Sequence, residues 1–194
     1  PYDAGSAFVV FGRAEGFPAT SNLNTLDGTN GFEMRNSAVG TSTVISVSGA
    51  GDVNADGYDD VLISNPSANG DAGSTFVVFG KASGFSAMVD LARLDGTDGF
   101  RIDGEAAQDT SGNSVSSAGD FNGDGYGDYV IGIPGYDLPA TLTTKIQKDA
   151  GRAVVISGKN GAELASIAGF AAKSAMGFVA VSYTHLTSPT LYPV

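Results

Sequence analysis

Two short acidic stretches of the chain combine residue types and a spacing that suit a hard cation. They are GDVNADGYDD at 51–60 and GDFNGDGYGD at 119–128. Numbered from its first Asp, each places side-chain oxygens at positions 1, 3, 5 and 9 and glycine at position 6. Calcium takes roughly six to eight oxygen ligands, and alternate side chains of a tightly curled loop can converge on one point. The sequence therefore predicts two Ca²⁺ sites. The predicted ligands are Asp52, Asn54, Asp56, the Tyr58 carbonyl and Asp60, and then Asp120, Asn122, Asp124, the Tyr126 carbonyl and Asp128.

The residues that follow each stretch indicate which kind of calcium loop this is. The first five ligand positions resemble an EF-hand, but the bidentate Glu of position 12 is replaced by Ile63 and Ile131. The stretches DVLIS and DYVIG then read as strands rather than helices. We therefore expect a loop that is closed by Asp at position 9 and set in a β-hairpin. Magnesium is the weaker candidate because it retains water and takes few carboxylates.

The alternative is that both stretches are ordinary turns, since Asp, Asn and Gly also cluster there. A turn does not need three carboxylates at fixed positions, and three converging carboxylates without a cation would repel one another. Their recurrence at matching positions in two stretches favours metal binding.

The acidic stretches belong to an internal repeat. GSAFVVFGRAEGF begins at Gly5 and GSTFVVFGKASGF at Gly73, an offset of 68 (73 − 5), and the two acidic stretches have the same offset (120 − 52). A third copy begins at Gly151, at the larger offset of 78 from Gly73 (151 − 73). Its extra length is assigned to a surface insertion, DLPATLTTKIQK (137–148).

Each repeat contains short runs of β-branched and aromatic residues bounded by Gly, Pro, Asn and Asp, which predict strands. These runs are continuously apolar, so both faces of the sheet should be covered. Repeated units of four short strands suit a β-propeller, and a β-solenoid is the second choice. The expected strands lie near 46–48, 61–64, 75–79 and 100–102, and near 114–117, 129–133, 153–156 and 164–167.

The composition excludes several classes of function. The chain has 194 residues and a net charge of −11, which argues against nucleic acid and anionic membranes as partners. There is no Cys, so disulfides and thiolate chemistry are excluded. The single histidine, His185, lies near the C-terminus, so Ser–His catalysis is not expected. No apolar run is long enough to span a bilayer, and no signal peptide is recognisable.

The stretches SVSGAGDVNADGYDDVLISNP and SVSSAGDFNGDGYGDYVIGIP resemble the FG-GAP repeats of integrin α-subunit propellers, and more closely their bacterial relatives. The Gly-Ala-Pro signature of that family is here SNP (64–66) and GIP (132–134). The resemblance implies an all-β fragment of a seven-bladed propeller with calcium in its loops. The expected units are a partial blade (1–41), a blade with loop 52–60 (42–112), a blade with loop 120–128 (113–170), the start of a further blade (171–182) and a non-native tail (183–194).

The resemblance also implies a non-catalytic binding or scaffold module of an extracellular adhesion or surface protein. The complete propeller would bind a protein or glycan, with no nucleic-acid partner and no membrane insertion. The alternative is an accessory propeller of a secreted hydrolase, such as a phospholipase or a polysaccharide-degrading enzyme. The two differ in what flanks the propeller in the parent gene: tandem surface modules or a catalytic domain.

The C-terminal stretch departs from the repeat. After MGFVAVS the pattern requires another acidic loop, but YTHLTSPTLYPV follows, and VSYTHLTSPT resembles the translation of a transposase sequencing adaptor. An unusual natural C-terminus is the alternative.

We predict that residues 183–194 contribute nothing to the core, because they lack the repeat pattern and contain Pro189 and Pro193. Deleting them should leave the thermal unfolding midpoint unchanged, as measured by circular dichroism. A large fall in that midpoint would show that the tail is a native part of the fold.

Overall fold

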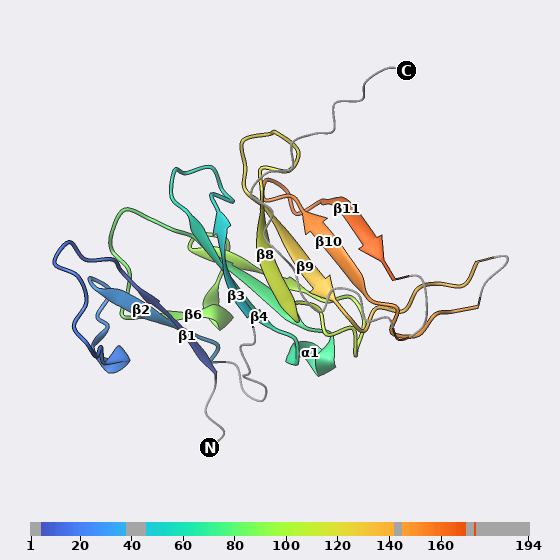
Figure 1. Ribbon diagram of the computed structural model, residues 1–194, viewed down its shortest axis with the longest axis horizontal. Helices are drawn as coiled ribbons and strands as arrows, with labels where there is room; N and C mark the ends of the chain where they lie inside the picture. Colours follow the sequence, from blue (N-terminus) through green and yellow to red (C-terminus); the bar gives the residue numbers. More distant parts are fainter. Residues whose placement is uncertain (1–4, 38–45, 142–144, 170–172, 174–194) are drawn as a thin grey trace.

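The computed structural model of the protein describes residues 5–37, 46–141, 145–169 and 173, which form eleven strands in three sheets. The sheets lie side by side in chain order (Figure 1). The strands are β1 (Ser6–Val10), β2 (Gly31–Arg35), β3 (Ser46–Gly51), β4 (Asp60–Asn65), β5 (Ser74–Val78), β6 (Met88–Asp90), β7 (Gly99–Asp103), β8 (Ser114–Gly119), β9 (Asp128–Ile133), β10 (Arg152–Ile156) and β11 (Glu163–Ala168). One short helix, α1 (Ala68–Asp71), and two 3₁₀ turns, η1 (Leu23–Thr25) and η2 (Leu91–Arg93), complete the described elements.

The second and third sheets are antiparallel and have the same design, with strand orders β3-β4-β5-β7 and β8-β9-β10-β11. All eight strands predicted for these two units are present, and each begins at or next to its expected first position. The fold is therefore the predicted one, an all-β part of a β-propeller. Within the described residues, the strands do not close into a barrel.

The first sheet is a partial version of the same design. β1 and β2 are the counterparts, one repeat earlier, of β5 and β7, and they pair in the same antiparallel way. Their outer neighbour is β6, which comes from the connection between β5 and β7 and pairs in parallel with β2. The sequence analysis did not predict β6, which is too short to show a period.

The middle sheet is covered on both faces because its strands are apolar at successive positions. Leu62 and Ile63 are adjacent in β4 and therefore point to opposite faces, yet both are 0% exposed. Leu62 packs with Tyr129, Ile131 and other residues of the third sheet. Ile63 packs in a separate cluster with Phe32 of the first sheet. Each sheet is thus stabilised by its neighbours.

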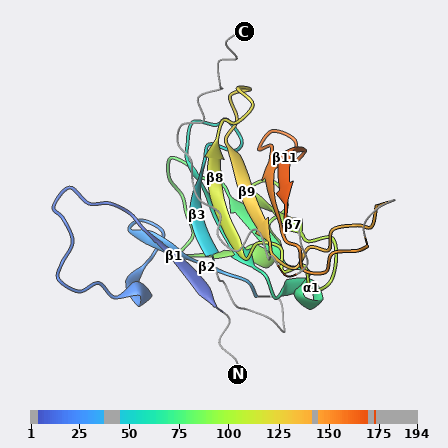
Figure 2. The same ribbon diagram turned by 45° about the vertical axis from the view of Figure 1, so that its right-hand side comes forward.

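Polar contacts fix the second sheet against the third where their first strands run side by side (Figure 2). The Ser46 hydroxyl accepts a hydrogen bond from the Val115 N–H at 3.2 Å. The Ser117 hydroxyl donates to the Ala50 carbonyl at 3.2 Å. Small residues on β3 and β8 thus allow the two strands to approach closely.

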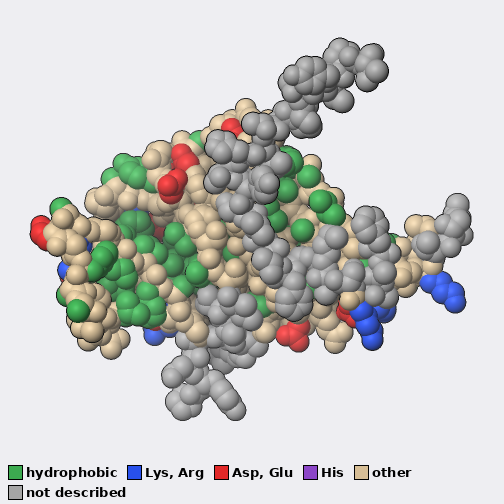
Figure 3. Space-filling view, in the orientation of Figure 1, with side chains coloured by type: hydrophobic (Ala, Val, Ile, Leu, Met, Phe, Trp, Pro, Cys, Tyr) green, Lys and Arg blue, Asp and Glu red, His purple; other side chains and the backbone are tan. Residues whose placement is uncertain are grey.

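The first sheet leaves apolar side chains uncovered, as expected for the outermost blade. Phe8 and Val10 of β1 are 40% and 38% exposed. Together with Val47 they line a hollow beside β1 and β3, and hydrophobic side chains gather over this part of the surface (Figure 3). No described helix is long and apolar enough to cross a membrane. The predicted tail and the start of the further blade lie outside the described residues, apart from Lys173.

We predict that Leu62→Ala lowers the free energy of unfolding by about 2–5 kcal/mol, because the cavity would lie between two packed sheets. Val47→Ala is the matched control, since Val47 is 55% exposed. Urea denaturation followed by circular dichroism measures both. Equal losses in the two variants would mean that the sheets do not pack as described.

Candidate metal-binding loops

The two acidic loops occupy equivalent places in the second and third sheets. Loop 52–60 connects β3 to β4, and loop 120–128 connects β8 to β9. The pairing shifts register between Gly49 and Gly51 in one hairpin and between Ser117 and Gly119 in the other. As predicted, each loop is set in a β-hairpin and is followed by a strand.

Side chains at positions 1, 3 and 5 of the first loop turn inward onto its backbone. The Asp52 carboxylate accepts from the N–H groups of Asp56 and Gly57 at 3.0 and 2.8 Å. The Asn54 carbonyl oxygen also accepts from Asp56, at 3.1 Å, and Asp56 accepts from the Tyr58 N–H at 2.9 Å. Gly57 has a φ of +92°, a conformation that glycine adopts without strain and that closes the curl.

The second loop repeats this network. Asp120 accepts from Asp124 and Gly125, both at 2.9 Å. Asn122 accepts from Asp124 at 2.9 Å, and Asp124 accepts from Tyr126 at 3.1 Å. Two stretches of different sequence thus adopt one geometry, as the matched spacing predicted.

The Asp at position 9 has a different environment. It is buried between its own loop and the segment that follows the third strand of its sheet. The Asp60 carboxylate accepts from the Val53 N–H at 2.8 Å and the Gly80 N–H at 2.7 Å. Asp128 accepts from Phe121 at 2.8 Å and Gly158 at 3.1 Å. Asp60 is 1% exposed and Asp128 is 0% exposed. Each therefore fixes its loop to the segment that follows the third strand of its own sheet.

Gly80 and Gly158 are functional residues that the sequence analysis missed. A Cβ at Gly80 would lie 2.3 Å from the Asp59 carbonyl oxygen, and one at Gly158 would lie 2.0 Å from that of Gly127. A side chain at either position would therefore displace the loop. The available signal was the glycine that ends VVFG and VVISG at the same place in each repeat.

The two loops also contact each other. The Gly127 N–H donates to the Asp52 carbonyl oxygen at 2.6 Å, which joins the second loop to the first across the sheet interface. A Cβ at Gly127 would lie 3.0 Å from that same oxygen. The geometry of each loop is thus linked to that of its neighbour.

Negative charge accumulates in the first loop. Burial raises the pKa of Asp60 from 3.8 to about 6, against the lowering effect of its Gly80 and Val53 hydrogen bonds. The carboxylates of Asp56 and Asp52 raise it further. Three acidic groups are therefore close enough to interact electrostatically.

The donor set suits a hard cation only in part. All of the converging side-chain atoms at positions 1, 3 and 5 are oxygens except the amide nitrogens of Asn54 and Asn122, which donate to Asp56 and Asp124. A carboxylate has about four lone-pair positions, so its N–H bonds leave room for a metal. Within the described part of the chain, however, no group of three or more acidic or histidine side chains is arranged to hold an ion. The two position-7 tyrosines differ in their surroundings: Tyr58 is 44% exposed, whereas the Lys159 Nζ atom lies 5.0 Å from the Tyr126 ring centroid.

Comparison with known protein families identifies both hairpins. Residues 44–78 and 111–156 match the family model of the FG-GAP repeat. These two segments are FG-GAP repeats. Each matched segment includes one acidic loop and the first three strands of its sheet. FG-GAP repeats form integrin-like propeller modules, which are generally non-catalytic and typically occur in extracellular or surface proteins. A search of curated proteins gives no match.

We predict that Asp60 makes the stability of the calcium-free protein depend on pH. Between about pH 4 and pH 6 the folded protein keeps a proton on Asp60 that the unfolded chain has lost. The stabilisation that this proton provides is complete below pH 4 and is lost as the pH rises through 6. As the pH rises over this range, the free energy of unfolding of the wild type should therefore fall relative to that of Asp60→Asn, whose residue 60 cannot ionise.

Urea denaturation at several pH values in calcium-free buffer measures the difference. Asp59→Asn, which removes an exposed carboxylate next to Asp60, controls for the general loss of one negative charge. A wild-type minus Asp60→Asn difference that stays constant from pH 4 to pH 6.5 would contradict the prediction.

Proposed function

We propose that this chain is a calcium-binding FG-GAP propeller segment that serves as a non-catalytic binding or scaffold module of an extracellular adhesion or surface protein. The observation that carries the proposal is the repeated loop geometry, in which side chains 1, 3 and 5 curl inward at both sites. Two units that differ in sequence around these positions keep the same oxygens in the same places.

In this proposal each loop binds one Ca²⁺ ion. The ligands are Asp52, Asn54, Asp56, Asp60 and the Tyr58 carbonyl, and their five counterparts in the second loop. The ion supplies positive charge that offsets the repulsion among the carboxylates. Three carboxylates and one divalent cation leave a net charge of about −1 (2 − 3) at each site, which suits the modest affinities of extracellular calcium modules.

Asp60 and Asp128 give such a site its structural effect. Each accepts hydrogen bonds from its own loop and from the glycine after the third strand. An ion bound to these carboxylates would therefore hold the hairpin onto the rest of the sheet. A stabilising role is consistent with a chain that has no Cys and no disulfides.

A binding or scaffold role is supported by the family and by the described side chains. FG-GAP modules are generally non-catalytic, and the carboxylates that could serve as acid or base are those assigned to the cation. The proposal places the module outside the cell, where free calcium is abundant enough for weak sites. Its ligand would be a protein or glycan bound by the complete propeller.

Calorimetry of the 194-residue chain tests the calcium sites. We expect two Ca²⁺ per chain with dissociation constants of roughly 10⁻⁴–10⁻³ M. Asp56→Ala and Asp124→Ala should each remove one site, because each deletes a central carboxylate of one loop.

Asp59→Ala is the matched control for these variants. It removes one negative charge from the same loop at a position that is not a predicted ligand, and glycine occupies the equivalent position 127. The proposal fails if the folded chain gives no calcium heat, if Mg²⁺ binds equally well, or if Asp59→Ala abolishes a site as Asp56→Ala does.

A further inference from the structure

A segment of the second repeat crosses over to cover the first sheet. This strap, residues 85–91, contains β6, which pairs in parallel with the outer strand β2. The Phe85 ring stacks on Phe32, with centroids 4.5 Å apart and an interplanar angle of 8°. Phe11 lies 5.7 Å from Phe85 and completes an aromatic group of three. Leu91, at the end of the strap, is 2% exposed.

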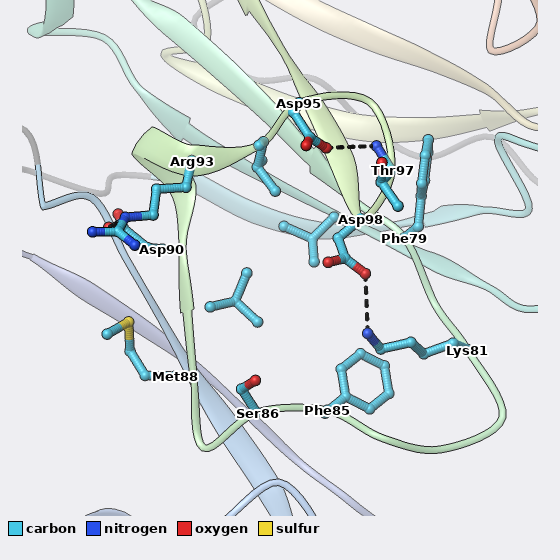
Figure 4. A pocket seen from close by; sticks show the side chains of 13 residues that line it. Phe79, Lys81, Phe85, Ser86, Met88, Asp90, Arg93, Asp95, Thr97 and Asp98 are labelled. Carbon is cyan, nitrogen blue, oxygen red and sulfur yellow. Dashed lines mark hydrogen bonds and ion pairs between the residues drawn. The ribbon is translucent and has the colours of Figure 1, made fainter.

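Polar contacts fix the strap at both ends. The Glu33 N–H of β2 donates to the Ala87 carbonyl at 2.9 Å. The Asp90 carboxylate accepts from the N–H and the hydroxyl of Ser37, at 3.1 and 2.6 Å. Lys81 lies over the Phe85 ring and pairs with Asp98 at 3.0 Å, and all three residues line a hollow of about 510 Å³ (Figure 4).

The first repeat contains the same segment without a partner. Residues 17–23 lie one repeat before the strap and share Phe17, Ala19 and Leu23 with Phe85, Ala87 and Leu91. Phe17 is 55% exposed and Leu23 is 41% exposed. The connection that contains them projects away from the sheets (Figure 2). This free strap therefore has the anchors of the docked one, but Phe17 projects into solvent and Leu23 only lines the open hollow beside β1 and β3.

The second sheet contains an edge strand that matches the docking site of the strap, and this edge also has no partner among the described residues. β7 is the counterpart of β2 and forms the outer edge of its sheet. Phe79 and Phe100, 5.8 Å apart, are the counterparts of Phe11 and Phe32, but no third ring joins them in the described structure. Phe32 is 2% exposed, whereas Phe100 is only partly buried.

The space for a strap is open at this edge. A Cβ at Gly28 would lie 2.0 Å from the Phe85 carbonyl oxygen of the docked strap. Its counterpart Gly96 has nothing within 4 Å and is exposed. The third sheet supplies no strap, because only residues 157–162 separate β10 from β11.

We propose that the free strap 17–23 of one chain docks on the β7 edge of a second copy, in the geometry that strap 85–91 and β2 show within the chain. The same register places Arg101 opposite Thr20, Ile102 opposite Ser21 and Asp103 opposite Asn22. Since the two surfaces lie on different sheets, the contact is heterologous, and copies add head to tail.

The polar ends of the two surfaces also match. Asn22 replaces Asp90, and Glu105 replaces Ser37. The Asn22 side-chain oxygen already accepts from the Asn24 N–H, which leaves its amide N–H groups to donate. An amide donor facing the Glu105 carboxylate is favourable, whereas an Asp at position 22 would repel it.

Sedimentation velocity of the full chain over a range of concentrations tests the association. We expect the average mass to rise beyond that of a dimer. Phe17→Ser with Leu23→Ser should raise the concentration for half-association at least about tenfold, because two buried anchors are lost. Arg101→Pro should act similarly by removing the outward N–H of β7, and Arg101→Ala is its control. Ile146→Ser controls for the loss of an exposed apolar side chain elsewhere, since Ile146 is 56% exposed.

Disulfide trapping tests the register independently of association strength. Because the chain has no cysteine, Thr20→Cys and Arg101→Cys can be made in separate samples and mixed. The mixture should form crosslinked pairs faster than Thr20→Cys mixed with Ile146→Cys, an exposed position away from β7. Equal crosslinking in the two mixtures would overturn the proposal. So would a chain that stays monomeric, or association that Ile146→Ser weakens and the Phe17 and Leu23 changes do not.

Discussion

The need to cover two apolar faces of each sheet governs this structure. Leu62 and Ile63 are neighbours in one strand, point in opposite directions and are both fully buried, so the middle sheet requires a neighbour on each side. A single sheet of this kind would expose one or both faces to water. The side-by-side order of the sheets, the small residues between β3 and β8 and the crossing of β6 all satisfy this requirement.

The acidic loops depend on the same packing. Asp60 lies at the start of β4, and its partner Gly80 follows β5, so the pairing of these two strands places the carboxylate and its donor together. The contact between Gly127 and Asp52 exists only because the second and third sheets lie against each other. The loop sequence specifies the curl, and the sheets specify where the ninth position lies.

The sequence was sufficient to predict the repeat, eight of the strands and the hairpin setting of the loops, because glycine and aspartate recur at fixed positions and the apolar runs are unambiguous. It was insufficient for β6, whose pairing joins Glu33 to Met88, far apart along the chain. It also did not show that Asp60 is held by Gly80. Both are long-range contacts that local spacing does not encode. Calcium binding is a prediction from the loop spacing, and the loop oxygens that would bind the ion accept backbone hydrogen bonds in the structure described.

The crossing strap separates the unit of duplication from the unit of packing. By sequence, residues 85–91 belong to the second repeat, but by contact they complete the first sheet. A gene duplication that copies one whole repeat therefore copies both a projecting segment and an edge able to receive one. An array of such units can lengthen without a new interface having to evolve. A single unit cut out at its repeat boundaries carries away part of its neighbour's covering.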